Sequence, residues 1–511
     1  MVAEILVSTD GDTSSGYPRT RAGAHTYGDI PAKCHHLSEP AEILTPRPYQ
    51  TAAIADLRAS MRDHRRVLLV LPTGAGKTFI AATVAAGAHA KARRVVFIVH
   101  RDELVRQTSA TFTRHGIPHA VVAAGHPTPS DRVVVASVQT LARRLDAMPA
   151  PDLLFVDEAH HAVAGTWRRI LAAWPSAFVV GLTATPERLD GRGLGDVFGH
   201  LIAGPTTADL IAGGYLSDYR AFAPSTADLA GVQTRMGDFD HSAVAEAMDR
   251  PALTGDIVAH YQRIAPDARA IAFAASVAHS EHLAEAIRAA GIAAAHVDGE
   301  TPRDQRRAII ADFAAGHIRV LCNVDLFGEG FDVPAVEAVI LARPTQSLAL
   351  HLQQVGRALR TAPGKDHAII LDHAGNLSRH GLPDEPRNWS LTAPKRTRKP
   401  SESGPAVRQC PTCYAVHRPT AACPECGHQY APMVRELEHR DGQLVELRRG
   451  DWTGGIDLAG ARGRDWFALL EAAGGDIKRL RQIARARGFR RGWATHRMNE
   501  WNRKRKQEIA A

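Results

Sequence analysis

The stretch Leu71–Thr78, with the sequence LPTGAGKT, constrains the fold of this chain more than any other feature. An apolar run, Val67–Leu71, leads into it, and an alanine-rich helical pattern, Phe79–His89, follows it. A strand that turns through glycines into a helix leaves backbone N–H groups free at the positive end of the helix dipole. We therefore expect a phosphate-binding loop between a buried strand and a helix.

The polar positions of this loop each have a chemical use. Gly74 and Gly76 let the backbone approach the phosphates, Lys77 reaches the outer phosphates, and the Thr78 hydroxyl is a ligand of Mg²⁺. The general pattern asks for a glycine where this chain has Leu71. The loop residues that we assign to the nucleotide are Thr73, Gly74, Ala75, Gly76, Lys77 and Thr78.

An acidic pair stands at the end of a second apolar run. Leu153–Val156 leads into Asp157-Glu158-Ala159-His160, about 80 residues after the loop. Asp157 would complete the Mg²⁺ shell, and Glu158 would orient and deprotonate the attacking water. A four-residue motif alone is weak evidence for a nucleotide site. Its position at the carboxyl end of a strand makes this evidence strong.

The length and composition of the chain limit the classes of protein to which it can belong. A chain of 511 residues predicts several domains, because single cores stop growing near roughly 250–300 residues. Its 45% hydrophobic and 23% charged residues are ordinary for a soluble globular protein. The apolar runs are far shorter than the ~20 residues of a membrane helix, and the N-terminus lacks the pattern of a secretory signal. We therefore expect a cytoplasmic protein, of a bacterium or a phage-infected cell, without disulfides.

Short apolar runs alternate with helical patterns twice along the chain. This alternation predicts an α/β fold of two domains, each a mostly parallel sheet with helices on both faces. The predicted runs are Val67–Leu71, Val95–Val99, Val133–Ala136, Leu153–Val156, Phe178–Gly181, Ile271–Ala274, Val320–Val324, Ala338–Leu341 and Ala368–Leu371. The predicted boundaries are 1–40 (disordered), 41–218 and 219–376 (the two α/β domains), 377–408 (basic linker), 409–430 (cysteine-rich) and 431–511 (basic, helical).

Several motifs occur in the order found in the superfamily-two helicases and translocases, which the chain resembles over about residues 43–376. They are the GKT loop, Asp157–His160, Leu182–Pro186 and Gln353–Arg360. That family also uses loops without the first glycine. The resemblance implies two RecA-like domains, with ATP bound in the cleft between them and nucleic acid across both.

The resemblance also implies roles for single residues. Arg47 and Gln50 match the motif that reads adenine, and Thr183 and Thr185 match the motif that couples hydrolysis to domain movement. The residues that match the motif presented to the γ-phosphate by the second domain are Gln353, Arg357 and Arg360, with Arg360 the first candidate for an arginine finger. Such an arginine typically accelerates phosphoryl transfer by about 10³–10⁵. We therefore expect hydrolysis to require domain closure and nucleic acid to stimulate it.

Contacts to nucleic acid are implied at the ends of several strands. The residues are Arg101, Gln139, Thr140, Ser276 and Gly299, with Gly330 and Asp332 of the run GEGFD (328–332) contacting nucleotide as well. Small hydroxyl and backbone donors suit contacts to the phosphate backbone, which do not read sequence. The alternative for each of these residues is a loop cap or a turn.

Four cysteines form two close pairs, Cys410 with Cys413 and Cys423 with Cys426. Two such knuckles supply four thiolates for a closed tetrahedral Zn²⁺ site, which would have a structural role. The loop between the pairs is shorter than in many zinc sites, and redox chemistry is the alternative.

The C-terminal segment is strongly basic. From Lys478 to the end there are twelve Lys or Arg and two acidic residues, a net charge of +10, against +8 for the whole chain. A polyanion is the natural partner, and a solvated helical tail is the alternative. Phe489, Trp493 and Trp501 lie among these arginines, where they could stack on unpaired bases or form the apolar face of a helix packed on the cysteine-rich module.

With its cysteine pairs and basic tail, the chain looks most like the bacterial RadD (YejH) type of DNA-repair helicase. That resemblance implies DNA-dependent ATP hydrolysis, repair of double-strand breaks, and work alongside single-strand-binding protein and the RecA recombinase. Two other functions stay open. One is an RNA-remodelling ATPase, and the other is a nucleic-acid-docking ATPase switch that separates no strands.

Overall fold

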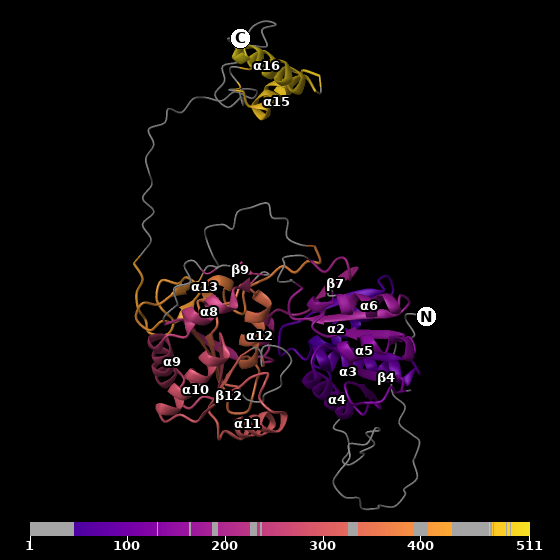
Figure 1. Ribbon diagram of the computed structural model, residues 1–511, viewed down its shortest axis with the longest axis vertical. Coiled ribbons are helices and arrows are strands. Elements are labelled where there is room, and N and C mark those ends of the chain that lie inside the picture. Colours follow the sequence, from indigo (N-terminus) through magenta and orange to yellow (C-terminus); the bar gives the residue numbers. More distant parts are fainter. Residues whose placement is uncertain are drawn as a thin grey trace, which may run out of the picture. The chain divides into compact units, whose positions relative to one another are not determined.

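The structure is a computed structural model, and it describes residues 45–431 and 470–510 apart from short gaps (Figure 1). The gaps are residues 130, 163–164, 187–192, 225–231, 233, 236–237, 325, 327–335, 393–406, 471–472, 474, 487 and 491. The predicted N-terminal extension 1–40 therefore lies outside the described residues. The chain divides into two compact units, Met1–Pro432 and Met433–Ala511, and each is described by itself. Of the helices described, none is both long and apolar enough to cross a bilayer.

The first α/β domain is built on a seven-stranded, fully parallel sheet. Its strands in spatial order are β3 (Ala120–Val122), β4 (Val133–Ser137), β2 (Val95–Val99), β5 (Leu153–Val156), β6 (Phe178–Thr183), β1 (Arg66–Val70) and β7 (His200–Ala203). Because parallel strands share one carboxyl edge, the residues that follow β1, β2, β4, β5 and β6 meet at that edge.

Side chains alternate between the two faces of this sheet, as the pleat requires. Along β1, Val67 and Leu69 join one core layer, whereas Leu68 and Val70 join the other. The helices of the first layer are α2 (Pro48–Ser60), α3 (Lys77–Ala90), α4 (Asp102–Arg114) and α7 (Thr207–Ala212), and those of the second are α5 (Val138–Arg143) and α6 (Gly165–Ala173). Short 3₁₀ turns follow at η1 (Leu145–Ala147) and η2 (Ala159–His161).

The second α/β domain repeats this design with six parallel strands. In spatial order they are β12 (Ala294–Val297), β13 (Val320–Asn323), β11 (Ala270–Ala274), β14 (Ala338–Ala342), β15 (His367–Asp372) and β8 (Asp218–Phe222). Its helices are α8 (His241–Met248), α9 (Pro251–Ile264), α10 (Val277–Ala289), α11 (Arg303–Ala315), α12 (Leu348–Ala358) and α13 (Asn376–His380), and β9 (Thr234–Arg235) pairs with β10 (Asp238–Phe239). The predicted pair of parallel α/β domains is confirmed.

The segment after α13 packs back on the first domain. Trp389 and Leu391 pack against the core layer that α5 and α6 cover, and the backbone N–H of Gly195 donates to the carbonyl of Leu391 at 2.9 Å. A Cβ on Gly195 would lie 3.2 Å from that carbonyl oxygen, so the approach is close. We call residues 382–392 the strap. All of the strap lies within 377–408, the stretch interpreted from sequence as a basic linker.

The cysteine-rich module covers the free edge of β8. Its strands β16 (Arg408–Gln409) and β17 (Val416–His417) form a small antiparallel pair. The Ala223 N–H donates to the Tyr414 carbonyl at 2.9 Å, and Arg220 Nε donates to Glu425 Oε2 at 2.8 Å. An exposed edge strand invites pairing with other chains, and this module removes that edge.

The second unit contains a helical hairpin of α15 (Ile477–Ala486) and α16 (Trp493–Ala510), drawn in yellow in Figure 1. Both helices lie in the segment 431–511, which the sequence predicts to be helical. Residues 432–469 of that segment lie outside the described residues. The hairpin has an apolar core of its own, which includes Leu480, Ile483 and Met498.

Candidate active site

The phosphate loop turns as its glycines require. Gly74 and Gly76 have φ angles of +88° and +79°, and α3 begins directly afterwards at Lys77. The positive φ angles disfavour any residue with a Cβ at these positions, and at Gly76 a Cβ would also displace Gln50 Nε2, which would lie 2.6 Å from it. The backbone N–H groups at the start of α3 are thereby left at the mouth of a cavity of about 1200 Å³.

Side chains of α2 donate hydrogen bonds to the backbone of the phosphate loop. The hydroxyl of Tyr49 donates to the carbonyl of Ala75 at 2.9 Å, and Gln50 Nε2 donates to the same oxygen at 3.2 Å. The Arg47 guanidinium lies 5.3 Å from the centroid of the Tyr215 ring and lines the cavity. The two residues assigned to adenine therefore flank the loop. Tyr49 and Tyr215 are additions that the motif did not indicate.

Lys77 lies inside this cavity with the acidic pair. Its Nζ donates to the Leu71 carbonyl at 3.2 Å, and Asp157 and Glu158 line the same space. Burial lowers the pKa of Lys77, whereas the carboxylates of Glu158 and Asp157 act to raise it. A half-buried ammonium beside a ring of backbone donors suits a phosphate ligand.

The acidic pair follows β5 in an uncommon backbone conformation. Asp157 and Glu158 are only 7% and 8% exposed, and Glu158 has a φ of +46°, which is costly for a residue with a Cβ. Glu158 Oε2 lies 3.5 Å from His160 Nδ1. This strain turns the carboxylate of Glu158 into the cavity beside Lys77.

Hydrogen bonds connect the acidic pair to the end of β6. His160 Nδ1 lies 3.4 Å from the Thr183 hydroxyl, which donates to the Thr185 carbonyl at 2.7 Å and accepts from the Thr185 N–H at 3.2 Å. Both threonines are buried. Thr183 is thus linked to Glu158 through His160, and Thr185 is linked to it through Thr183.

Helix α12 of the second domain packs directly on the phosphate loop. A Cβ on Gly356 would lie 2.5 Å from the Thr73 Cβ, so only glycine permits this approach. Arg357 and Arg360 line the same cavity as Lys77. Gln353 is buried at 2% exposure and is not among the cavity-lining residues; within the described part of the chain its Nε2 has no hydrogen-bond partner.

Lys365 is a residue that sequence reasoning missed. Its Nζ donates to the carbonyls of Arg360 and Val336, both at 2.8 Å, and also to the Ala358 carbonyl. Burial lowers the pKa of Lys365 to about 8. An ammonium on the last carbonyls of a helix stabilises its C-terminus, and here that end carries both arginines of the cavity. No motif marks such a lysine.

The residues assigned to nucleic acid follow strand ends, and most contact their own surroundings. Arg101 Nη1 donates to the Leu326 carbonyl of the second domain at 3.3 Å, and Gln139 Nε2 donates to the His100 carbonyl at 3.2 Å. The hydroxyl of Ser276 caps α10 by accepting the His279 N–H at 3.1 Å. Thr140 lies in the first turn of α5, where its hydroxyl accepts from the Ser137 hydroxyl at 3.0 Å. Gly299 follows β12, and its carbonyl accepts from Arg306 at 3.1 Å. Gly330 and Asp332 lie outside the described residues.

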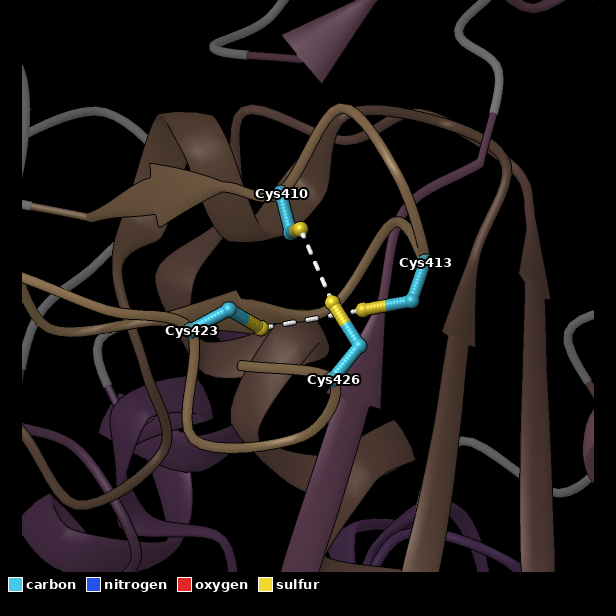
Figure 2. Close-up of side chains that lie close together, drawn as sticks. All are labelled: Cys410, Cys413, Cys423 and Cys426. Carbon is cyan, nitrogen blue, oxygen red and sulfur yellow. Dashed lines mark hydrogen bonds between the residues drawn. The ribbon is translucent and has the colours of Figure 1, made fainter. Parts of the chain in front are cut away.

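The four paired cysteines form one cluster, as Figure 2 shows. Their sulfur atoms all lie within 4.8 Å of one another, with Cys410 and Cys426 at 3.6 Å and Cys413 and Cys423 at 3.7 Å. The side chains come from two loops and point toward a common centre. Four sulfurs at this spacing can close around a single ion.

The loop, the acidic pair and the arginines of α12 define a nucleoside triphosphatase of two RecA-like domains. Two family models match the chain, "Type III restriction enzyme, res subunit" over residues 43–188 and "Helicase conserved C-terminal domain" over 254–362. The chain belongs to the superfamily-two helicases, and it is an enzyme that hydrolyses ATP and acts on nucleic acid. ATP and Mg²⁺ are the substrate and ion that this family implies.

Several known proteins are similar to this chain. A 51.5 kDa protein of a Lactococcus phage is 35% identical, over 74% of this chain and 83% of the phage protein. The Saccharomyces cerevisiae protein named "Putative ATP-dependent helicase IRC3" is 31% identical, over 65% of this chain and 52% of its own length. A fragment structure of a type I restriction HsdR subunit from Vibrio vulnificus, described there as putative, has the same fold at 23% identity and a TM-score of 0.54, covering 66% of this chain and 67% of the fragment.

Proposed function

We propose that this protein is an ATP-dependent DNA helicase or translocase that works in DNA repair or recombination. The observation that carries the proposal is one cavity lined from both domains. Lys77 and Glu158 reach it from the first domain, and Arg357 and Arg360 reach it from the second. A site assembled from two domains makes hydrolysis depend on their closure, which is what a motor requires.

The chain's own residues have distinct roles in the proposed hydrolysis. The loop N–H groups and Lys77 hold the triphosphate, and Glu158 accepts a proton from the water that attacks the γ-phosphorus. Arg360, with Arg357 beside it, stabilises the negative charge that develops in the transition state. Gln353 supports this helix face from within the second domain.

Two ions fit the residues present. The Thr78 hydroxyl and the Asp157 carboxylate line the cavity together and are oxygen donors, which Mg²⁺ prefers. Bound there, Mg²⁺ would supply positive charge that offsets the charge of the phosphates. The four clustered cysteine sulfurs fit a structural Zn²⁺, because the set leaves no open position for catalysis. We propose that the cysteine-rich module is a zinc ribbon.

The finer assignment rests on the C-terminal half. The cysteine cluster and the basic hairpin support the resemblance to RadD-type DNA-repair helicases, with single-strand-binding protein and recombinase as the expected partners. An RNA-remodelling ATPase would use the same core, and an ATPase switch would bind nucleic acid without moving along it. For nucleic-acid contacts we propose Arg101, Gln139, Thr140, Ser276 and Gly299, with Gly330 and Asp332 in the GEGFD run.

Displacement assays test the motor directly. The wild-type protein should displace a streptavidin block or an annealed strand from DNA only when ATP is hydrolysed, and the Lys77→Ala variant should not. Movement on RNA but not on DNA would favour the remodelling ATPase. ATP hydrolysis stimulated by DNA with no displacement would favour the switch.

A further inference from the structure

The helical hairpin of the second unit is a small module with its own core. Ile483 and Met498 are buried between α15 and α16, and the ring of Trp501 packs over Gly475, where a Cβ would lie 3.1 Å from it. Trp501 is therefore part of the internal packing. The sequence leaves two roles open for the aromatic residues, stacking on bases and packing in the protein. Trp501 has the packing role, and it packs within this hairpin.

Phe489 behaves differently, because its ring is turned to solvent. It is 38% exposed, and among the described residues only Val277 is another large hydrophobic side chain so exposed. The ring stacks on Trp493 with centroids 4.3 Å apart and an angle of 27° between the planes. The two rings lie face to face, and Phe489 is the more exposed of the two, because Trp493 also packs against the apolar core of the hairpin.

The backbone of this turn holds Phe489 in place. Gly488 has a φ of +67°, and the Phe489 N–H donates to the Ala484 carbonyl at 2.9 Å, which ends α15 in a defined left-handed cap. The Trp493 N–H donates to the Arg490 carbonyl at 3.0 Å as α16 begins. These bonds fix the backbone on each side of the exposed ring, at the end of α15 and at the start of α16.

The hairpin exposes many basic side chains. They lie on α15 and next to Phe489 in the chain, namely Lys478, Arg479, Arg481, Arg485 and Arg490. Of the described acidic residues in the hairpin, Asp476 accepts the Lys478 N–H at 2.7 Å as a cap of α15, and Glu500 pairs with Arg497 at 2.7 Å. The hairpin that carries Phe489 is therefore suited to bind an anionic polymer.

We propose that Phe489 and Trp493 form a stacking platform for an unpaired base of a DNA strand whose phosphates contact the basic face of α15. A base in a duplex is already stacked on both sides, so the platform selects single strands or strand ends. An apolar protein partner would not need the exposed basic side chains. A purely electrostatic contact to a duplex would not need the exposed aromatic side chain of Phe489. That the polymer is DNA rests on the proposed function. The platform would be a second contact for that DNA, in the C-terminal hairpin.

The test compares three substitutions of Phe489 in the full chain. Phe489→Tyr keeps a stacking ring, Phe489→Leu keeps an apolar side chain without a ring, and Phe489→Ala removes both. Without nucleotide, binding to a single-stranded oligonucleotide should weaken roughly 5- to 150-fold in the Leu and Ala variants, which is the range for one lost base–aromatic stack. The Tyr variant should bind as the wild type does, and binding to a blunt duplex of equal length should be the same in all four proteins.

Equal single-strand affinity in all four proteins would overturn the proposal. So would a loss in Phe489→Ala alone, since Leu would then serve as well as a ring and the surface would be an apolar contact for a protein. Thermal unfolding of each variant checks that the hairpin is intact. Ultraviolet crosslinking of a 5-iodouracil strand to the wild type should give an adduct within residues 488–493, and adducts confined to residues before 432 would contradict the platform.

The outcome also separates this proposal from the proposed motor. If DNA stimulates ATP hydrolysis in the wild type but Phe489→Leu binds single strands normally, only the platform is wrong. If the crosslink forms at Phe489 but no DNA stimulates hydrolysis, only the motor is wrong. An RNA oligonucleotide of the same sequence shows whether the platform distinguishes the two sugars.

Discussion

At the scale of single residues, the active site is recognisable by groups held in positions that a stable core would avoid. Glu158 has a left-handed backbone, and the ammonium of Lys77 is enclosed although burial lowers its pKa. Such arrangements persist where the surrounding structure imposes them, and they cluster at functional sites. The proposed roles, Lys77 on a triphosphate and Glu158 on an attacking water, would account for both arrangements.

Replacing Glu158 tests its role as the base. Glu158→Gln keeps the shape of the side chain but removes the proton acceptor, so ATP turnover should fall by about 10²–10⁴ while nucleotide binding persists. Steady-state turnover and fluorescent-nucleotide binding measure the two effects. Normal turnover in this variant would rule out Glu158 as the base.

The contact between Gly356 and Thr73 gives a second prediction at this scale. Gly356→Ala adds a Cβ that would lie 2.5 Å from the Thr73 Cβ, so α12 must move away from the loop. We expect turnover to fall with little change in overall folding, because the arginines of α12 move with the helix. Gly87→Ala is the matched control, since its Cβ meets nothing within 4 Å and α3 should gain about 0.5–1 kcal/mol. Unchanged turnover in Gly356→Ala would show that this contact does not position the arginines.

At the scale of secondary structure elements, Lys365 determines how α12 ends. Lys365→Met removes three donated hydrogen bonds to carbonyls, including that of Arg360. Unpaired buried carbonyls cost about 1–3 kcal/mol, so the melting temperature should fall. Because α12 also loses its C-terminal anchor, ATP turnover at saturating ATP should fall below that of the wild type even at temperatures where the variant is folded. A variant with a lower melting temperature but full turnover would mean that Lys365 is structural only.

The cysteine-rich module gives another prediction for an element. Elemental analysis should find one zinc per chain, and replacing Cys410 and Cys413 with Ser should release it, because a segment this small depends on its metal to fold. The loss should also expose the edge of β8, which the module covers. A wild-type protein without zinc would contradict the proposal and leave redox chemistry as the alternative.

At the scale of the whole molecule, the sequence predicts the central strands and the active-site residues much better than the periphery. Runs such as Val95–Val99 and Leu153–Val156 reappear as β2 and β5, because central strands of a parallel sheet are apolar on both faces. The strands that were missed are the sheet edges, β3, β7, β12 and β8. Edge strands are half exposed, so β8, with the sequence DYRAF, has no continuous apolar run.

Contacts between distant segments were also beyond prediction. Trp389 and Leu391 looked like part of a linker, yet they pack on the first domain, because two apolar side chains in a basic, proline-rich stretch give no periodic pattern. Lys365 and Gly356 act through contacts that only the folded chain creates. By contrast, the loop, Asp157 and Glu158 carry their chemistry in short motifs, and the structure brings them into one cavity.

In the proposed motor, nucleic acid drives ATP hydrolysis by bringing Arg357 and Arg360 to the γ-phosphate. The most direct measurement is ATP turnover with single-stranded DNA, duplex DNA, forked DNA or RNA, with Lys77→Ala as the blank. We predict strong stimulation by DNA that is absent from the blank and is lost in an Arg360→Ala variant that still binds ATP. Turnover that no polymer changes would contradict the account and leave a nucleotide switch controlled by some other partner.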